Sequence, residues 1–306
     1  MDTWRGLALL SGLVLAPLLP GVINRVKALV AGRHGPPLLQ GYWDLAKLLR
    51  KGAVYSRTTT WVFRAAPTVG LAAVVAALAL VPAGRSPGAV AFAGDLILFA
   101  YCLGLMRFVT VLAAMDTGSA FEGMGASREV QFAAVAEPAL LLALATLARL
   151  TGSLSLTGID AGLSEATWTA AAPALALIGA ALLIVFLAEN ARIPIDDPNT
   201  HLELTMIHEV MVLDYSGPDL AFVLYGAALK LWVLGALIVE VAVATLGVTG
   251  PAGAGIFLLG MVVLAMAVGV VESVMARLSL LKVPRLLVAA GALSLLAFTL
   301  VLRSVA

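Results

Sequence analysis

Seven ionisable residues interrupt the long apolar runs of this sequence, where a charge is costly. They are Asp95, Arg107, Glu137, Glu189, Lys230, Glu240 and Glu272. A charge buried in a membrane costs at least a few kcal/mol, so each group must be paired, neutral or hydrated. A lysine beside a carboxylate can exchange a proton when the charge of its partner changes. For any one residue the alternative is an ion pair that only fixes helix register, but the set as a whole predicts a proton or cation path.

The depth of these residues differs from run to run. Lys230 is expected near the middle of the membrane, and Glu240 lies ten residues further along the same run, roughly 15 Å away at 1.5 Å per residue. Glu137 and Glu272 are expected about two turns and about one turn inside their runs. Asp95 and Arg107 lie near the ends of their run, and their side chains are expected to reach the membrane interface.

The most polar stretch of the chain covers residues 189–219. Two prolines near its start stop the preceding apolar run from continuing as a helix. A short polar helix, capped by Asn199 or Thr200, is expected to run to about Leu213. The Ser-Gly-Pro sequence that follows is typical of a helix end.

The same stretch carries a surplus of carboxyl groups. Its only permanent cation is Arg192, whereas its acidic residues are Glu189, Asp196, Asp197, Glu203, Glu209, Asp214 and Asp219. Crowded carboxylates raise one another's pKa values, so some are expected to hold protons near neutral pH. His201 and His208 suggest a metal site, but their spacing and flanking residues fit no zinc motif. We therefore predict a hydrogen-bonded polar helix and no metal site.

Composition excludes a soluble globular protein. The chain has 61% hydrophobic residues, 12% charged residues and a mean hydropathy of +1.03, whereas ordinary domains carry roughly 25% charged residues. The net charge of +1 indicates no nucleic-acid partner. The single cysteine, Cys102, excludes an internal disulfide and any cysteine cluster for iron–sulfur or structural zinc. If electrons are involved, another subunit carries them.

Eight apolar runs are long enough to cross a membrane. They predict an all-α integral membrane protein with a single polytopic domain over residues 1–306. The first run is interpreted as a retained span, because Asp2 precedes Arg5 and no clean cleavage site follows. The predicted spans lie near residues 4–24, 61–82, 89–112, 130–150, 171–189, 220–246, 254–275 and 284–303.

Basic residues predict the orientation of the spans. Thirteen lysines and arginines fall on one side of the predicted spans and four on the other. Because positive residues favour the cytoplasm, both termini are predicted to lie outside the inner (cytoplasmic) membrane.

The first cytoplasmic loop contains an amphipathic segment, residues 41–51. Tyr42 and Leu45 fall on one helical face, and Asp44 and Lys47 fall on the other. This pattern predicts a helix that lies in the membrane interface. The alternative is a loop helix that packs on a partner protein.

Several segments carry a resemblance to a known family. The most specific is 189–217, and the others are 32–40 (GRHGPPLLQ) with 44–48 (DLAKL), 124–129 (MGASRE) and 136–138 (AEP). Over nearly its whole length the chain resembles the membrane subunit shared by group 4 energy-converting nickel–iron hydrogenases, formate hydrogenlyases and respiratory complex I, where it is called subunit 1. The text IDDPNTHLELTMIHE at 195–209 is similar to the hydrogenase type, and departs from the glutamate-rich helix that borders the quinone cavity of complex I.

The resemblance implies a membrane-anchor and coupling subunit of a multisubunit hydrogenase-type complex, non-catalytic alone and without a cofactor of its own. It implies that partner subunits carry the nickel–iron centre and the iron–sulfur clusters. The expected partners are a hydrogenase large subunit, a small iron–sulfur subunit, antiporter-like membrane subunits and the lipid bilayer. Electron transfer in the partner arm would then drive proton or sodium translocation.

Under this hypothesis the loops after the first, third and fifth spans form a docking face and a proton-responsive cluster. Glu203, Glu209 and Asp214 would sense redox-linked protonation, and Glu240 would lie towards the outer end of the path. The residues assigned to proton transfer and coupling are Glu137, Glu189, Glu203, Glu209, Asp214, Lys230, Glu240 and Glu272. Those assigned to docking are Arg33, Asp44, Lys47, Arg128, Glu129, Arg192, Asp196, Asp197 and Tyr215.

Two alternatives remain open. A quinone-cavity subunit of a complex I-type NADH dehydrogenase would use residues 41–51 as an entrance helix and would need a cavity behind it. A purely structural membrane anchor would use its charges only to pair helices. In that case the buried pairs could be replaced by apolar residues without loss of coupling.

Overall fold

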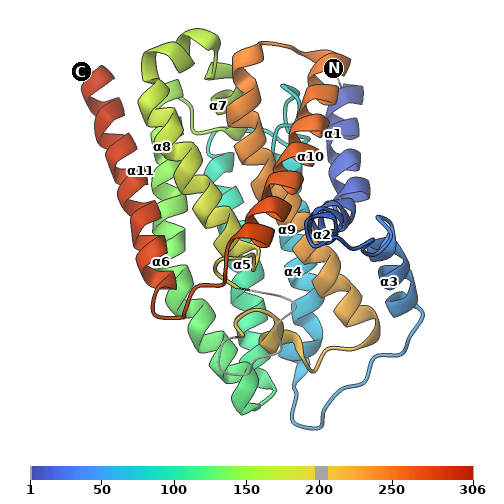
Figure 1. Ribbon diagram of the computed structural model, residues 1–306. Helices are drawn as coiled ribbons and strands as arrows, with labels where there is room; N and C mark the ends of the chain where they lie inside the picture. Colours follow the sequence, from blue (N-terminus) through green and yellow to red (C-terminus); the bar gives the residue numbers. More distant parts are fainter. Residues whose placement is uncertain (1, 197–205, 306) are drawn as a thin grey trace.

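A computed structural model describes residues 2–196 and 206–305, and within them the chain folds into a bundle of helices (Figure 1). Seven of the described helices are long and apolar enough to cross a membrane, or eight if a bent pair at the start counts as one span. This confirms the predicted all-α membrane fold. The helices are α1 (Asp2–Leu15), α2 (Leu18–Val30), α3 (Gln40–Leu49), α4 (Trp61–Leu80), α5 (Asp95–Asp116), α6 (Ala120–Thr151), α7 (Leu156–Gly162), α8 (Glu165–Glu189), η1 (Glu209–Val212), α9 (Gly217–Val243), η2 (Ala244–Leu246), α10 (Gly250–Val274) and α11 (Val283–Val305).

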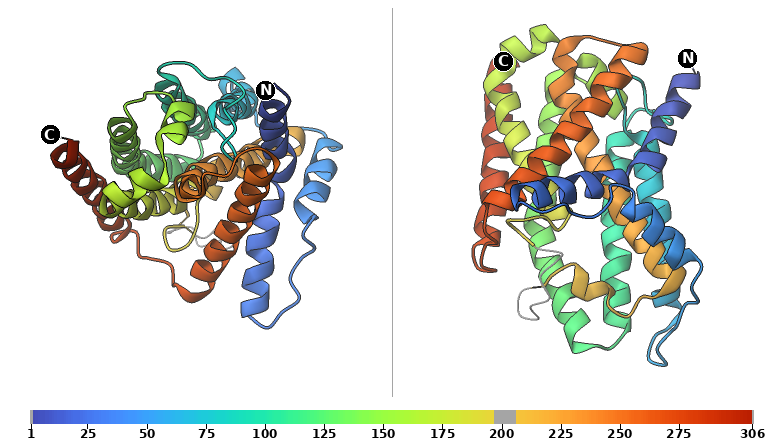
Figure 2. Two further views of the ribbon diagram at one scale, coloured as in Figure 1. Left: turned by 90° about the horizontal axis from the view of Figure 1, so that it is seen from above. Right: turned by 45° about the vertical axis from the view of Figure 1, so that its right-hand side comes forward.

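The first predicted span, 4–24, is not one straight helix. Helix α1 ends at Leu15, and α2 begins at Leu18 with its axis bent by 50°. Pro17 lies at the break, where its ring and its missing N–H interrupt the helical hydrogen bonds. As a result α2 leaves the direction of α1 and runs across the bundle, towards α10 (Figure 2).

The polar connections also differ from their predicted form. Helix α6 begins at Ala120 rather than near residue 130, so it extends well beyond the apolar run (Figure 1). Polarity marks where a chain leaves the membrane and does not mark where a helix ends. Of the short helix predicted to end near Leu213, the described residues form only the 3₁₀ helix η1; residues 199–205 lie outside the described part of the chain.

Both chain ends lie at the same end of the bundle, as an even number of spans predicts (Figure 1). Helix α3 lies beside the bundle against α2 and α9, and the amphipathic segment 41–51 is thereby confirmed as a helix. Large apolar side chains on the outer faces, such as Trp61 (77% exposed) and Val274 (76% exposed), fit contact with lipid rather than water.

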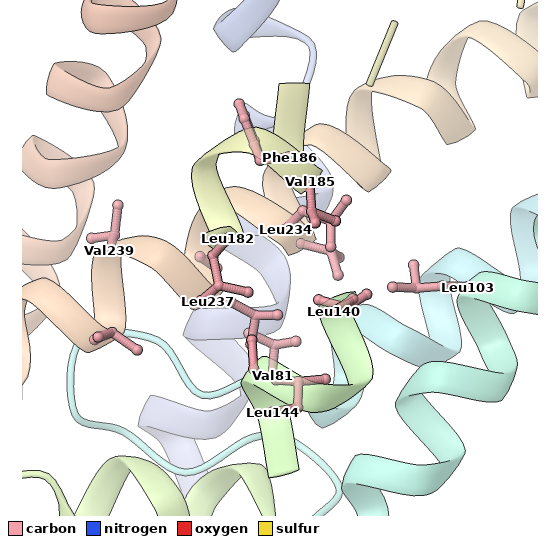
Figure 3. Packing of buried hydrophobic residues seen from close by; sticks show 14 of the residues in the cluster. Val81, Leu103, Leu140, Leu144, Leu182, Val185, Phe186, Leu234, Leu237 and Val239 are labelled. Carbon is pink, nitrogen blue, oxygen red and sulfur yellow. The ribbon is translucent and has the colours of Figure 1, made fainter. Parts of the chain in front are cut away.

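Buried apolar side chains from α6, α8 and α9 pack together in an apolar layer inside the bundle (Figure 3). Leu140 and Leu144 come from α6, and Leu182 comes from α8. Leu234 and Leu237 come from α9. Along α9, Leu234 and Leu237 of this apolar layer lie between two buried ionisable residues, Lys230 and Glu240.

Gly269 on α10 lets that helix pack directly on α2. A Cβ atom at this position would lie 2.7 Å from Cβ of Val26 and 3.0 Å from the carbonyl oxygen of Ile23. Gly269→Ala is therefore expected to destabilise the protein by about 1–3 kcal/mol, as overpacked contacts do. The control is Gly179→Ala on α8, where a Cβ atom would meet nothing within 4 Å. Equal melting temperatures of the two variants in the purified complex would contradict this packing.

Candidate functional site

Arg107 on α5 is the centre of a buried charge network. Its side chain is 9% exposed, and Nε donates to Oε1 of Glu129 at 3.0 Å. The two terminal nitrogens bind Glu137 on α6 and Glu189 at the end of α8. One guanidinium thus faces three carboxylates, and this arrangement requires further cations close by because buried charges must be compensated.

Lys230 on α9 and His208 beside η1 supply two of those cations. Nζ of Lys230 lies 2.7 Å from Oε2 of Glu189. Nε2 of His208 lies 3.1 Å from Oε2 of Glu129, and its Nδ1 lies 3.2 Å from Oδ2 of Asp196. Arg277 completes the network at 3.0 Å from Asp196. Contacts therefore run in an order of alternating charge through Lys230, Glu189, Arg107, Glu129, His208, Asp196 and Arg277.

Counted over the described residues named here, the network is neutral when His208 carries a proton, because four cationic groups then face four carboxylates, Glu137 included. Burial alone would lower the pKa of His208, but the carboxylates of Glu129 and Asp196 outweigh burial and raise it to about 9. Burial likewise favours protonation of Asp196, yet contacts with His208 and Arg277 hold its pKa below the usual value. The sequence predicts that some carboxyl groups of this stretch hold protons near neutral pH. In the network, the carboxylates are instead paired with cations.

A second buried group lies where α2, α10 and the end of α8 meet. Glu272 on α10 has a side chain with 0% exposure. Its Oε2 lies 2.8 Å from Nζ of Lys27, and its Oε1 lies 3.4 Å from a terminal nitrogen of Arg192. The broken first span brings Lys27 to this place, so the bend has an electrostatic role as well as a steric one.

A cavity of about 490 Å³ lies beside the network. Pro17 and Pro20 at the bend, together with Gly41 and Asp44 on α3, line one part of it. The charged residues that line the remainder are Arg107, Glu129, Glu189, Arg192, Asp196, His208, Glu209 and Lys230. The volume falls within the range of small-molecule sites, which is about 300–1,000 Å³.

The structure brings some of the predicted coupling residues together and leaves others apart. Glu137, Glu189 and Lys230 belong to the network. Glu209 lines the cavity, and Glu272 lies in the neighbouring group. Two further predicted residues lie away from the network, the cavity and the neighbouring group: Glu240, near the opposite end of α9, and Asp214, which is exposed. Glu203 lies outside the described part of the chain, as does Asp197 of the predicted docking residues.

The predicted docking residues divide in the same way. Glu129 and Asp196 belong to the network, and Arg192 pairs with Glu272. Arg128 donates to the carbonyl of Met206, and the hydroxyl of Tyr215 donates to the carbonyl of Phe63 at 3.0 Å, so both attach the loop to the bundle. The docking residues left exposed at the surface are Arg33, Asp44 and Lys47.

Two predictions about helix α5 are wrong. Asp95 does not reach the interface: it is fully buried and accepts hydrogen bonds of 2.7 Å from the N–H of Leu156 and the hydroxyl of Ser155. Arg107 likewise points inward instead of towards the interface. The signal for Arg107 was present, because an arginine inside an apolar run without a local partner must find one on another helix. The spacing of His208 in the sequence points to no partner, and only the fold places it against Glu129 and Asp196. The described residues contain no group of three His, Cys, Asp or Glu side chains that could hold a metal ion.

Comparison with known proteins shows similarity over nearly the whole chain. A family model described as NADH dehydrogenase matches residues 5–302. Formate hydrogenlyase subunit 4 of Escherichia coli is 31% identical over 299 residues, which cover 95% of this chain and 96% of that protein. Hydrogenase-4 component C of Escherichia coli is 33% identical over 227 residues, which cover 74% of this chain and 70% of that protein. An NADH-quinone oxidoreductase subunit of Anaplasma phagocytophilum is 26% identical, covering 71% of this chain and 68% of that protein.

The fold has been seen before in a solved membrane complex. A chain of the membrane-bound sulfane sulfur reductase, an archaeal respiratory membrane complex, superposes with a TM-score of 0.78. The match covers 97% of this chain and 99% of that chain at 19% sequence identity. At this level of identity the likeness concerns the fold.

Proposed function

The chain belongs to the NADH dehydrogenase subunit 1 family, and on this basis we propose that it is the membrane-anchor and coupling subunit of a multisubunit hydrogenase-type respiratory complex. Its relatives from hydrogenase-4 and formate hydrogenlyase, at 33% and 31% identity, favour this type over the quinone-reducing type, represented at 26%. The subunit would dock a nickel–iron and iron–sulfur arm on the membrane and link its electron transfer to proton or sodium translocation.

One observation carries this proposal: the network of alternating charge joins the polar segment after α8 to the interior of α9. Asp196 and His208 lie in that segment, and Lys230 lies within the span. Loss of the His208 proton would leave Glu129 with one cation fewer. Arg107, shared among three carboxylates, would then be drawn towards Glu129, and Glu189 would depend more on Lys230. A charge change near the docking face can thereby reach the membrane.

The proposed partners follow from the surfaces on either side of the network. The hydrogenase large subunit and the small iron–sulfur subunit would bind at the end that carries α3, η1 and the polar loops, and they would hold the nickel–iron and iron–sulfur groups. Antiporter-like membrane subunits would pack on the exposed apolar helix faces. In this arrangement the end of the bundle with both chain termini faces outward from the inner membrane.

Lys230→Met tests the coupling role. The complex is expected to assemble and to transfer electrons, while ion translocation falls at least about fivefold, because coupling free energies of about 1–3 kcal/mol correspond to roughly 5–150-fold. Proteoliposomes with a pH-sensitive dye measure the translocation. Lys282→Met in the exposed loop before α11 is the control, and Glu137→Gln is a second test. Unaltered translocation in both network variants with intact assembly would contradict the proposal and favour a purely structural anchor.

A second candidate function is favoured by the cavity. Its size and its position behind α3 are what the quinone-cavity alternative requires. Solvent extraction of the purified complex followed by chromatography distinguishes the two. Stoichiometric quinone would support a quinone-reactive subunit. Its absence, together with hydrogenase turnover that resists quinone-site inhibitors, would support the hydrogenase type.

A further inference from the structure

Two buried carboxyl groups meet at the end of the bundle that carries both chain termini. Glu240 on α9 is 4% exposed, and Asp160 on the short helix α7 is 6% exposed. Their carboxyl groups lie within hydrogen-bonding reach of each other. Ionised carboxylates only accept hydrogen bonds, so a bond between two carboxyl groups requires a proton on one of them.

A tight turn holds Glu240 in place. The backbones of Ala83 and Ser86 exchange two hydrogen bonds, of 3.1 and 3.2 Å, around Gly84 and Arg85. Both central residues have φ of +63°, which is the geometry of a type I′ turn. The backbone N–H groups of these two residues donate to the carboxyl group of Glu240. Successive N–H groups directed at one point form an anion-binding concavity.

The turn cannot move away easily. A Cβ atom on Gly84 would lie 2.7 Å from the backbone of Ala254, so the turn packs directly on α10. Arg85 adopts a positive φ although it is not glycine, a backbone conformation that its Cβ atom disfavours. Its guanidinium binds the carbonyls of Asp160 and Leu163 and lies 3.3 Å from Oδ1 of Asp160. These contacts compensate for the backbone conformation.

The groups that surround the pair determine its charge. Arg85 is the cation placed against it by the turn, and Asp160 is the acidic group from α7. Helix α10 places the backbone of residues 253–254 against the turn, and Trp168 of α8 donates its ring N–H to the carbonyl of Val241. One cation beside two carboxyl groups is neutral when the pair holds one proton. Burial, which raises the pKa of Asp160, acts in the same direction.

A proton fits this site better than a metal ion does. Oxygen ligands on all sides are needed to replace the hydration shell of a hard cation. Here the two backbone N–H groups and the guanidinium present hydrogen-bond donors towards the carboxyl groups. Oε2 of Glu240 is buried and receives no hydrogen bond from an N–H or hydroxyl donor of the described residues. A shared proton gives that oxygen its partner.

The pair is insulated from the charge network. Between Lys230 and Glu240, α9 reads LWVLGALIV, without an ionisable side chain. Leu234 and Leu237 of this segment pack with Leu182 of α8 in the apolar layer (Figure 3). Along α9, the two polar sites are therefore separated by apolar side chains.

We propose that Asp160 and Glu240, held by the turn 83–86, form a proton-binding site that stores one proton beyond the apolar layer. The binding of the proton is inferred from the contacts of Asp160 and Glu240. Its use as the outer station of an ion path rests on the proposed function. Transfer from the network to this station would require transient hydration of the layer, because its apolar side chains cannot carry a proton.

Infrared spectroscopy of the purified complex tests the storage. The wild-type complex at neutral pH is expected to show the carbonyl band of a protonated carboxyl group, shifted in D₂O, that is lost in both Glu240→Gln and Asp160→Asn. Glu165→Gln, at an exposed position near the same end, is the control and is expected to keep the band. If the wild-type complex lacks this carbonyl band, the proposal is wrong, whatever the variants show. Persistence of the band in both amide variants would also overturn it.

The test of proton storage by Asp160 and Glu240 and the test of the proposed function are independent of each other. The infrared band is measured in the resting complex, so its loss in the amide variants supports the storage whatever happens to ion translocation. Unaltered translocation in Lys230→Met counts against the proposed function and leaves the band unaffected.

Discussion

The Arg107→Ala variant is expected to lose ion translocation and much of its stability together. Removing this guanidinium takes the cation away from the buried carboxylates of Glu129 and Glu189 and from the half-exposed carboxylate of Glu137. Breaking a buried ion pair by removing one partner costs about 3–5 kcal/mol, because the remaining charge is uncompensated. Thermal unfolding of the purified complex measures the loss, and proteoliposomes measure the translocation.

The control for this variant is Arg149→Ala on α6, an arginine that is exposed. It is expected to change little, since exposed charges contribute at most about 1 kcal/mol. A double variant, Arg107→Gln with Glu189→Gln, removes a cation and an anion together, so it should recover part of the stability but not the translocation. If Arg107→Ala were as stable as Arg149→Ala, the network would not be the buried unit that the contacts describe.

The stability of the segment around His208 is expected to fall as the pH rises through about 9. The contacts with Glu129 and Asp196 raise the pKa of His208 from 6.5 to about 9, with burial opposing them. A group with a raised pKa stabilises the fold fully below its unfolded pKa, here about 6.5, and loses that contribution as pH passes the folded value. The shift corresponds to at most about 3 kcal/mol, and solvent screening reduces it because 24% of the side chain is exposed.

Hydrogen–deuterium exchange of residues 206–216, corrected for the intrinsic rate, measures this dependence between about pH 6 and 9.5. Wild-type protection should decline across the upper part of this range. His208→Gln should exchange faster at low pH and show little further change, whereas His34→Gln, at an exposed position, should behave like the wild type. A flat wild-type profile would mean that His208 is not charged within the network.

The sequence by itself determined the class of the protein and most of its elements. Apolar runs predicted seven of the eight spans as single helices, because the need to bury backbone hydrogen bonds in lipid leaves a long apolar segment no alternative. Amphipathic spacing predicted α3 in the same local way. The charged stretch 189–219 carried the family resemblance, and the cost of buried charge identified Glu137, Glu189 and Lys230 as a set.

Only the tertiary structure decided which charges meet. Arg107 binds carboxylates 22, 30 and 82 residues away, and Glu240 meets Asp160 from a different helix. Such partners depend on how the helices pack against one another, and the hydropathy of the sequence does not determine that packing. The bend at Pro17 is a further case, since a proline can be accommodated or can break a span according to its neighbours. Here it breaks the span, brings Lys27 to Glu272 and provides one wall of the cavity.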